Sequence, residues 1–153
     1  VRTIAGKRGT FAVVALSDGQ TTMDVLVFAK AYENYKNLLK PDEMLIFTGK
    51  GRKDERSGGM SFVCDKVITI EEMRVQKGAT LMLEIAEGQD LGAIRDVLLT
   101  GQANDHRGVS CEVSIRSNGV KAEVILKNNY APTDQLLNQL KNSDSVSVAR
   151  FVY

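Results

Sequence analysis

The 153-residue sequence predicts two small domains, a β domain with one helix followed by an α+β domain with two helices. The apolar patterns run as β-β-β-α-β-β in the first half and as β-α-β-β-α-β in the second. Residues 1–78 carry 13 basic and 10 acidic side chains, whereas residues 79–153 carry 7 and 9, so the two halves differ in the sign of their net charge. Residues 71–78 end in a glycine before a new apolar segment, which is typical of a connector. We therefore expect domains at residues 1–73 and 79–153.

The first half is expected to contain five strands. A leading strand at residues 1–5 is followed by apolar and β-branched runs at 10–16 and 21–28, joined by Asp18-Gly19, which is a hairpin signal. A helical period at residues 30–39 then ends before Pro41. A second hairpin, residues 44–53 and 60–70, completes the element order of the OB-fold, a five-stranded barrel with one helix.

The second half is expected to be a small α+β sandwich. Its strands are predicted at residues 80–85, 109–116, 120–127 and 146–152, and its helices at 90–100 and 133–141. Asn118-Gly119 between the middle two strands is a strong hairpin signal. This order matches the split βαβ pattern of ferredoxin-like domains.

Residues suited to catalysis are scarce. The single histidine, His106, follows Asp105 directly, and neighbouring side chains rarely form the geometry of a general base and its orienting carboxylate. Cys64 and Cys111 lie in different halves and, with one histidine, give no zinc spacing. Such distant cysteines fit a reduced, cytoplasmic protein. No uncharged run approaches the ~20 apolar residues that cross a bilayer. We therefore expect no catalytic site, no metal, no cofactor and no membrane association.

Basic side chains cluster where an OB-fold binds nucleic acid. In that fold, the loop after the first strand and the loop between the fourth and fifth strands border the binding groove. Such grooves bind single strands through charge and through stacking of bases on aromatic rings. The predicted phosphate contacts are Arg2, Lys7, Arg8, Lys50, Arg52, Lys53 and Arg56. Phe47 and Phe62 are the stacking candidates. The alternative is a solvated charged surface for the cations and a place in the core for the two rings.

The last three residues, Phe151, Val152 and Tyr153, extend past the regular strand pattern. Exposed aromatic residues dominate the energies of many protein interfaces, so these residues are candidates for a partner anchor. The alternative is a terminus that is frayed or folded back.

Four segments resemble one family. They are GKRGTFAVVALSDG at residues 6–19, DVLVFAKAYENYKNLL at 24–39, LIFTGKG at 45–51 and APTDQLL at 131–137. All four are similar, in order, to stretches of the alpha subunits of bacterial DNA polymerase III, most specifically in the first forty residues. The chain departs from the family pattern at Ala5 or Gly6, where the family has Thr, at Ser17-Asp18, where it has an acidic pair, and at Ala29, where it has Pro.

The resemblance implies the carboxy-terminal end of a replicative DNA-directed DNA polymerase, a cytoplasmic nucleotidyltransferase. It implies an OB domain that contacts single-stranded template DNA, and a second domain that docks the tau subunit of the clamp loader beside other replisome subunits. The family's polymerase carboxylates and phosphoesterase-like site have no counterpart in this sequence, so the chain is expected to be a non-catalytic module. Two alternatives remain open at this point. One is an OB-fold tRNA- or RNA-binding module fused to an unrelated α+β domain, and the other is a small-molecule sensor built on the second half.

Overall fold

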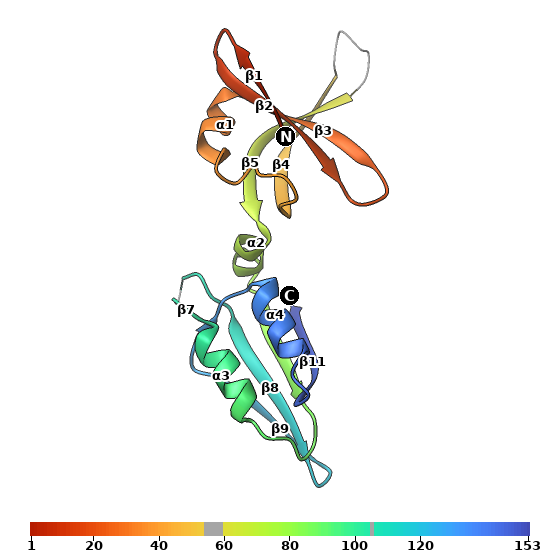
Figure 1. Cartoon of the computed structure of the whole chain (residues 1–153), viewed down its shortest axis with the longest axis vertical. Coiled ribbons are helices and arrows are strands. Elements are labelled where there is room, and N and C mark those ends of the chain that lie inside the picture. Colours follow the sequence, from red (N-terminus) through yellow and green to blue (C-terminus); the bar gives the residue numbers. More distant parts are fainter. Residues whose placement is uncertain (54–59, 105) are drawn as a thin grey trace. The chain divides into compact units, whose positions relative to one another are not determined.

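The computed structural model describes residues 1–53, 60–104 and 106–153. Over this part of the chain it is a mixed α+β protein with eleven strands and four helices. The chain divides into two compact units, Val1–Ile70 and Glu71–Tyr153 (Figure 1). None of the helices in the described residues is long and apolar enough to cross a membrane.

The first unit is a five-stranded sheet with one helix, and its elements follow one another in the predicted order. Its strands are β1 (Arg2–Gly6), β2 (Gly9–Ser17), β3 (Thr22–Val27), β4 (Leu45–Lys53) and β5 (Met60–Thr69). They lie side by side in the order β1-β2-β3-β5-β4, with α1 (Ala29–Tyr35) between β3 and β4 along the chain. β3 and β5 run parallel, and the other neighbours are antiparallel.

The predicted barrel is not closed. Among the described residues β1 pairs only with β2, and β4 pairs only with β5, so both are edge strands. Every residue of β1 is exposed, and Ile4 is its one large apolar side chain. A strand with so little apolar surface gains little hydrophobic free energy from a second pairing, which accounts for the open sheet.

A glycine permits β4 and β5 to approach each other closely at one position. The β4–β5 ladder has a register shift between Thr48 and Gly49. A Cβ atom at Gly49 would overlap the carbonyl oxygen of Val63 on β5, so a side chain cannot be accommodated without moving the backbone.

Beneath α1 the core of the first unit is a cluster of seven buried residues, which are Ala12, Val14, Val25, Val27, Leu39, Cys64 and Val67.

The second unit is a four-stranded sheet with α3 (Gly92–Thr100) and α4 (Asp134–Lys141) packed on one face (Figure 1). The sheet order is β11-β6-β8-β9. The strands are β6 (Thr80–Ile85), β8 (Ser110–Ser117), β9 (Val120–Ile125) and β11 (Val146–Val152). A short separate pair joins β7 (Gln102–Ala103) to β10 (Asn129–Tyr130).

The split βαβ prediction is wrong in its strand order. β8 pairs directly with β6 in parallel, whereas a ferredoxin-like sheet would place β9 between them. The burial of the two hairpin strands explains the choice. Cys111 on β8 is fully buried, while all six residues of β9 are exposed, so the strand that contributes to the core occupies the central position and β9 lies at the edge.

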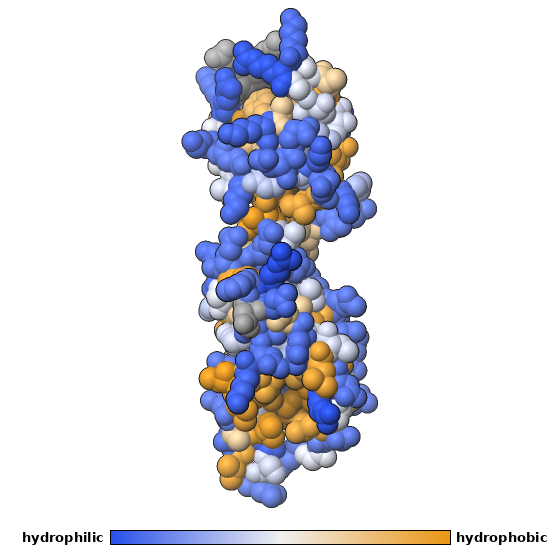
Figure 2. Space-filling view, turned by 90° about the vertical axis from the view of Figure 1, so that its left-hand side faces the viewer, coloured by the Kyte–Doolittle hydropathy of each residue, from blue (hydrophilic) through white to orange (hydrophobic). Residues whose placement is uncertain are grey.

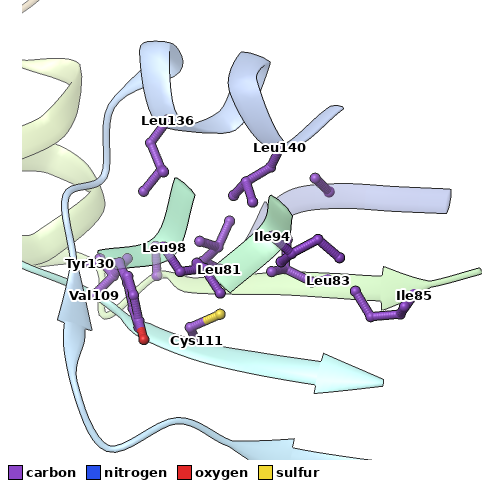
Figure 3. Close-up of a cluster of buried hydrophobic side chains, with 12 residues drawn as sticks. Leu81, Leu83, Ile85, Ile94, Leu98, Val109, Cys111, Tyr130, Leu136 and Leu140 are labelled. Carbon is purple, nitrogen blue, oxygen red and sulfur yellow. The ribbon is translucent and has the colours of Figure 1, made fainter. Parts of the chain in front are cut away.

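The core of the second unit is built from alternating residues of β6 and the inner faces of both helices (Figure 3). Leu81, Leu83 and Ile85 point toward the helices, where they meet two residues of α3 and two of α4. Those four are Ile94, Leu98, Leu136 and Leu140. Burial raises the pKa of the Cys111 thiol in this cluster to about 12.

The predicted connector carries helix α2 (Ile70–Gln76), and one of its residues belongs to the second unit's packing. The guanidinium of Arg74, which is 9% exposed, donates hydrogen bonds to the Pro132 carbonyl oxygen at 2.7 Å and to the Asp134 carboxylate at 2.6 Å. It also lies 4.4 Å from the ring centroid of Phe151. Arg74 therefore links α2, the start of α4 and the carboxy-terminal strand.

Candidate nucleic-acid interface

The first unit has two cavities that share lining residues. The larger, of about 780 Å³, lies over β3 and the paired ends of β4 and β5, and also reaches Arg2 and Val13. The smaller, of about 660 Å³, is bounded by the β1–β2 turn and the start of α1. Phe28 and Arg52 line both, so the cavities adjoin at these two side chains.

Basic side chains surround both cavities. Arg2, Arg52 and Lys53 line the larger one, and Lys7, Arg8, Lys30 and Arg52 line the smaller. Over the described residues, none of these six cations forms an ion pair, and Asp24 is the single acidic side chain that lines either cavity. Unpaired cations around a concave surface favour an anionic ligand.

Two aromatic rings also border this surface. Phe28 is 44% exposed and lies where β3 gives way to α1, and the half-buried Phe11 lies on β2. Their ring centroids are 6.2 Å apart, with the planes tilted by 44°. Two exposed methionines, Met23 and Met60, add apolar surface to the larger cavity. The arrangement therefore offers charge for phosphates and flat apolar surface for bases.

The structure brings together five of the seven predicted basic residues. Arg2, Lys7, Arg8, Arg52 and Lys53 line the cavities. Lys50 is exposed on β4 but lines neither cavity. Arg56 falls outside the described residues.

Phe47 and Phe62 are half-buried and packed against the first unit's core cluster, and neither lines these two cavities. Sequence reasoning missed Phe11, Phe28 and Lys30. Lys30 lies in the helical segment, away from the loops on which the reasoning concentrated. The available signal was at Phe28, because a large aromatic residue at a helix N-cap, where Ser, Thr, Asp or Asn is preferred, has no capping role.

Three known proteins that are similar to this chain carry the same name. No family model matches it. DNA polymerase III subunit alpha of Neisseria meningitidis serogroup A is 28% identical over 145 residues, which is 92% of this chain. The protein of the same name from Escherichia coli K12 is 28% identical over 148 residues, and that of Pseudomonas aeruginosa is 23% identical over 151 residues. The chain is similar to a part of DNA polymerase III subunit alpha. It spans only 12–13% of the length of these relatives.

The similarity to DNA polymerase III subunit alpha covers 92% of the chain and therefore extends into the second unit, which carries the predicted partner anchor. Phe151 is half-buried under the Arg74 guanidinium, Val152 is half-buried, and Tyr153 is 66% exposed. Of the three, only Tyr153 presents most of its side chain to solvent. Figure 2 also shows an apolar area on the second unit. The large apolar side chains that are exposed on this unit include Leu99, Val120 and Val124.

The remaining chemistry-bearing residues do not assemble into a site in the described part of the chain. His106 is exposed, and Asp105 falls outside the described residues. Over the described ranges, no three His, Cys, Asp or Glu side chains are grouped closely enough to hold a metal ion. Cys64 and Cys111 are buried free thiols, and burial raises the pKa of each.

Proposed function

We propose that the chain is a non-catalytic module of a cytoplasmic bacterial replicative polymerase, and that its first unit is an OB-type domain that binds single-stranded DNA. The observation that carries the proposal is the pair of adjoining cavities, surrounded by six cations with no ion pair among the described residues. The strand order β1-β2-β3-β5-β4 supports the OB-type assignment. The similarity to DNA polymerase III subunit alpha supports DNA as the anion.

The distribution of cations suits an extended polyanion better than a single small anion. Lys7 and Arg8 lie on the β1–β2 turn, Lys30 lies on α1, and Arg52 and Lys53 lie at the end of β4. A strand that passes through both cavities meets basic residues along its whole path. Each neutralised phosphate releases counterions, so binding of this kind weakens as salt is added.

The test is a salt titration with single-stranded oligo-dT of about 12 nucleotides, within the site size of one OB-type domain. We expect affinity to fall steeply between about 50 and about 200 mM salt, with a log–log slope of about −0.7 per phosphate contact. Oligo-rU of the same length serves as the second ligand. Absence of DNA binding at low salt, or a flat salt dependence, would refute the proposal. Tighter binding of RNA than of DNA would favour the alternative of an RNA-binding module.

For the second unit we propose docking of the tau subunit of the clamp loader, with Phe151, Val152 and Tyr153 as the contact segment. The support is the 66% exposure of Tyr153 directly after β11, in contrast to the half-buried Phe151 and Val152 before it. Tyr153→Ala should weaken tau binding, measured with purified tau, and should leave the fold intact because the side chain is largely in solvent. Deleting all three residues would also remove the ring beneath Arg74, so the single substitution is the cleaner test. Full tau affinity in Tyr153→Ala would place the contact elsewhere.

A further inference from the structure

We infer that Phe28 is a stacking platform for one nucleobase, held in place by Phe11 and positioned between basic groups that contact the adjacent phosphates. The inference rests on the proposed function of the first unit. It specifies which residue contacts a base of the DNA rather than its phosphate backbone. The ligand chemistry is a single-stranded nucleotide with an unpaired base.

The exposure of Phe28 is the first observation. A phenylalanine buries a large apolar area when it enters a core, yet 44% of this residue remains in solvent. Phe47 on β4 and Phe62 on β5 are half-buried and pack against the core cluster. Phe28 therefore presents more of its side chain to solvent than either of these two rings does.

The position of Phe28 in the chain is the second observation. It is the N-cap of α1, with extended φ of −67° and ψ of 163°, and its side chain makes no capping hydrogen bond. A Ser, Thr, Asp or Asn at this position would stabilise the helix by about 1 kcal/mol. A residue that forgoes this stabilisation and also exposes a large apolar ring is poorly explained by folding alone.

The contact between the Phe11 and Phe28 rings is the third observation. The Phe11 ring centroid lies 6.2 Å from that of Phe28 with the planes tilted by 44°, and a contact of this kind restricts the motion of the Phe28 ring. A pre-ordered ring loses less entropy when a base stacks on it than a freely rotating ring would.

The β1–β2 turn lies close to the rings and needs glycine at two positions. Gly9 has a φ of +110°, and a Cβ atom there would lie 3.1 Å from Ala29, the residue after Phe28. A Cβ atom at Gly6 would lie 3.5 Å from the Phe11 ring. Because both positions are glycine, the turn packs closely against this corner and adds no side chain there except those of Lys7 and Arg8.

Basic groups flank the platform on both sides. Lys7, Arg8 and Lys30 line the smaller cavity, while Arg2 and Lys53 line the larger, and Phe28 and Arg52 line both. A strand whose base stacks on Phe28 would therefore have cations within each adjoining cavity for the phosphates before and after that base. Single-stranded DNA binders combine these two elements, a charged track and aromatic rings.

The experiment is a thermodynamic cycle on the whole chain with two ligands of equal charge. One is single-stranded oligo-dT, and the other is an oligonucleotide of equal length in which every nucleotide is an abasic spacer. The variants are Phe28→Ala, Phe28→Trp and, as a matched exposed apolar side chain on the other unit, Leu99→Ala. Affinities are measured at one low salt concentration and again across a salt series.

We expect Phe28→Ala to lose about tenfold in affinity for oligo-dT, since stacking on one aromatic ring contributes about 1–3 kcal/mol per base. The same variant should bind the abasic ligand as the unchanged chain does, with the same salt slope. Phe28→Trp should retain oligo-dT binding, and Leu99→Ala should match the unchanged chain on both ligands.

Equal losses on both ligands would mean that Phe28 acts through the fold or the backbone contacts, and unchanged oligo-dT affinity would mean that it does not touch a base. Either result overturns the stacking role while leaving salt-dependent DNA binding, and therefore the proposed function, in place. If neither ligand binds the unchanged chain at low salt, both the stacking role and the proposed function are wrong.

Discussion

The sheet of the second unit lies beneath two helices and encloses a core cluster of twelve buried residues, whereas the first unit has one short helix over a cluster of seven. The first unit also leaves adjoining cavities of about 780 and 660 Å³ open along its sheet, with exposed cations and an exposed phenylalanine around them. Apolar burial is the main source of stability, so the second unit is expected to be the more stable of the two. The comparison teaches that the surface suited to a ligand lies on the unit with the smaller buried apolar core.

The largest effect is expected from a substitution that destabilises the first unit and leaves the second unit unchanged. Gly49→Ala forces a Cβ atom into the Val63 carbonyl oxygen, which must shift the β4–β5 ladder and should destabilise the first unit by about 3 kcal/mol or more. DNA binding should be lost, while the second unit still unfolds cooperatively in urea.

Gly51→Ala is the matched control on the same strand. Its Cβ atom would approach only the terminal methyl group of Met60, at 3.2 Å, and that flexible side chain can move. If Gly49→Ala and Gly51→Ala unfold at the same urea concentration, the close strand approach is not a determinant of this unit's stability.

The converse change is Leu140→Ala in α4. Leu140 is fully buried in the second unit's cluster, so the substitution should cost about 2–5 kcal/mol through lost burial and the cavity left behind. Circular dichroism during urea unfolding should show a transition of the second unit at a lower urea concentration, with DNA affinity unchanged.

The control is Leu99→Ala on α3, at a side chain that is 51% exposed, which should change the free energy of unfolding by less than about 0.5 kcal/mol. Loss of DNA binding in Leu140→Ala would show that the units do not fold independently.

Arg74→Met should cost the second unit about 2 kcal/mol, because it leaves the Pro132 carbonyl oxygen and the Asp134 carboxylate without their charged donor. The methionine preserves apolar contact with the Phe151 ring but not the cation–π attraction. Thermal unfolding of the second unit measures the effect, with Lys77→Met as an exposed control. A stability equal to that of the unchanged chain would mean that this buried arginine does not secure the carboxy-terminal strand.

Alkaline pH should weaken the second unit through Cys111. Its pKa is raised from 9.0 to about 12 by burial, so the folded state keeps the thiol protonated while the unfolded state ionises. The stabilising effect is complete below pH 9 and is lost as the pH rises toward 12, at up to about 1.4 kcal/mol per pH unit. Urea unfolding across this range should show a shallower pH dependence in Cys111→Ala. A dependence as steep as that of the unchanged chain would assign the effect to other groups, such as Tyr130, whose pKa burial also raises.

The sequence was sufficient for the elements that local patterns determine. The Asp18-Gly19 and Asn118-Gly119 hairpins and the helices before Pro41 and after Pro132 were all anticipated, because turn chemistry and proline act over a few residues. The strand order of the second sheet could not be predicted from local patterns, because β8 and β9 form the same hairpin whichever of them lies beside β6. Their burial decides it, and burial depends on α3 and α4.

The candidate site was predictable to a similar degree. Loop positions identified Lys7, Arg8, Arg52 and Lys53 because the loops themselves were recognisable. The choice among aromatic rings was not predictable, because Phe28, Phe47 and Phe62 all lie in or beside apolar runs. Only packing distinguishes a ring that fills the core from one that remains exposed.

The most direct measurement compares two triple variants that carry the same change in charge. Lys7→Ala, Arg8→Ala and Arg52→Ala remove a lysine and two arginines from the cavities of the first unit. Arg95→Ala, Arg107→Ala and Lys127→Ala remove the same residue types from exposed positions on the second unit. In a salt titration with oligo-dT, the first variant should lose about 2 from the log–log slope, at about 0.7 per phosphate contact, whereas the second should keep the slope of the unchanged chain. Equal slopes in the two variants would contradict the assignment of DNA binding to the cavities of the first unit.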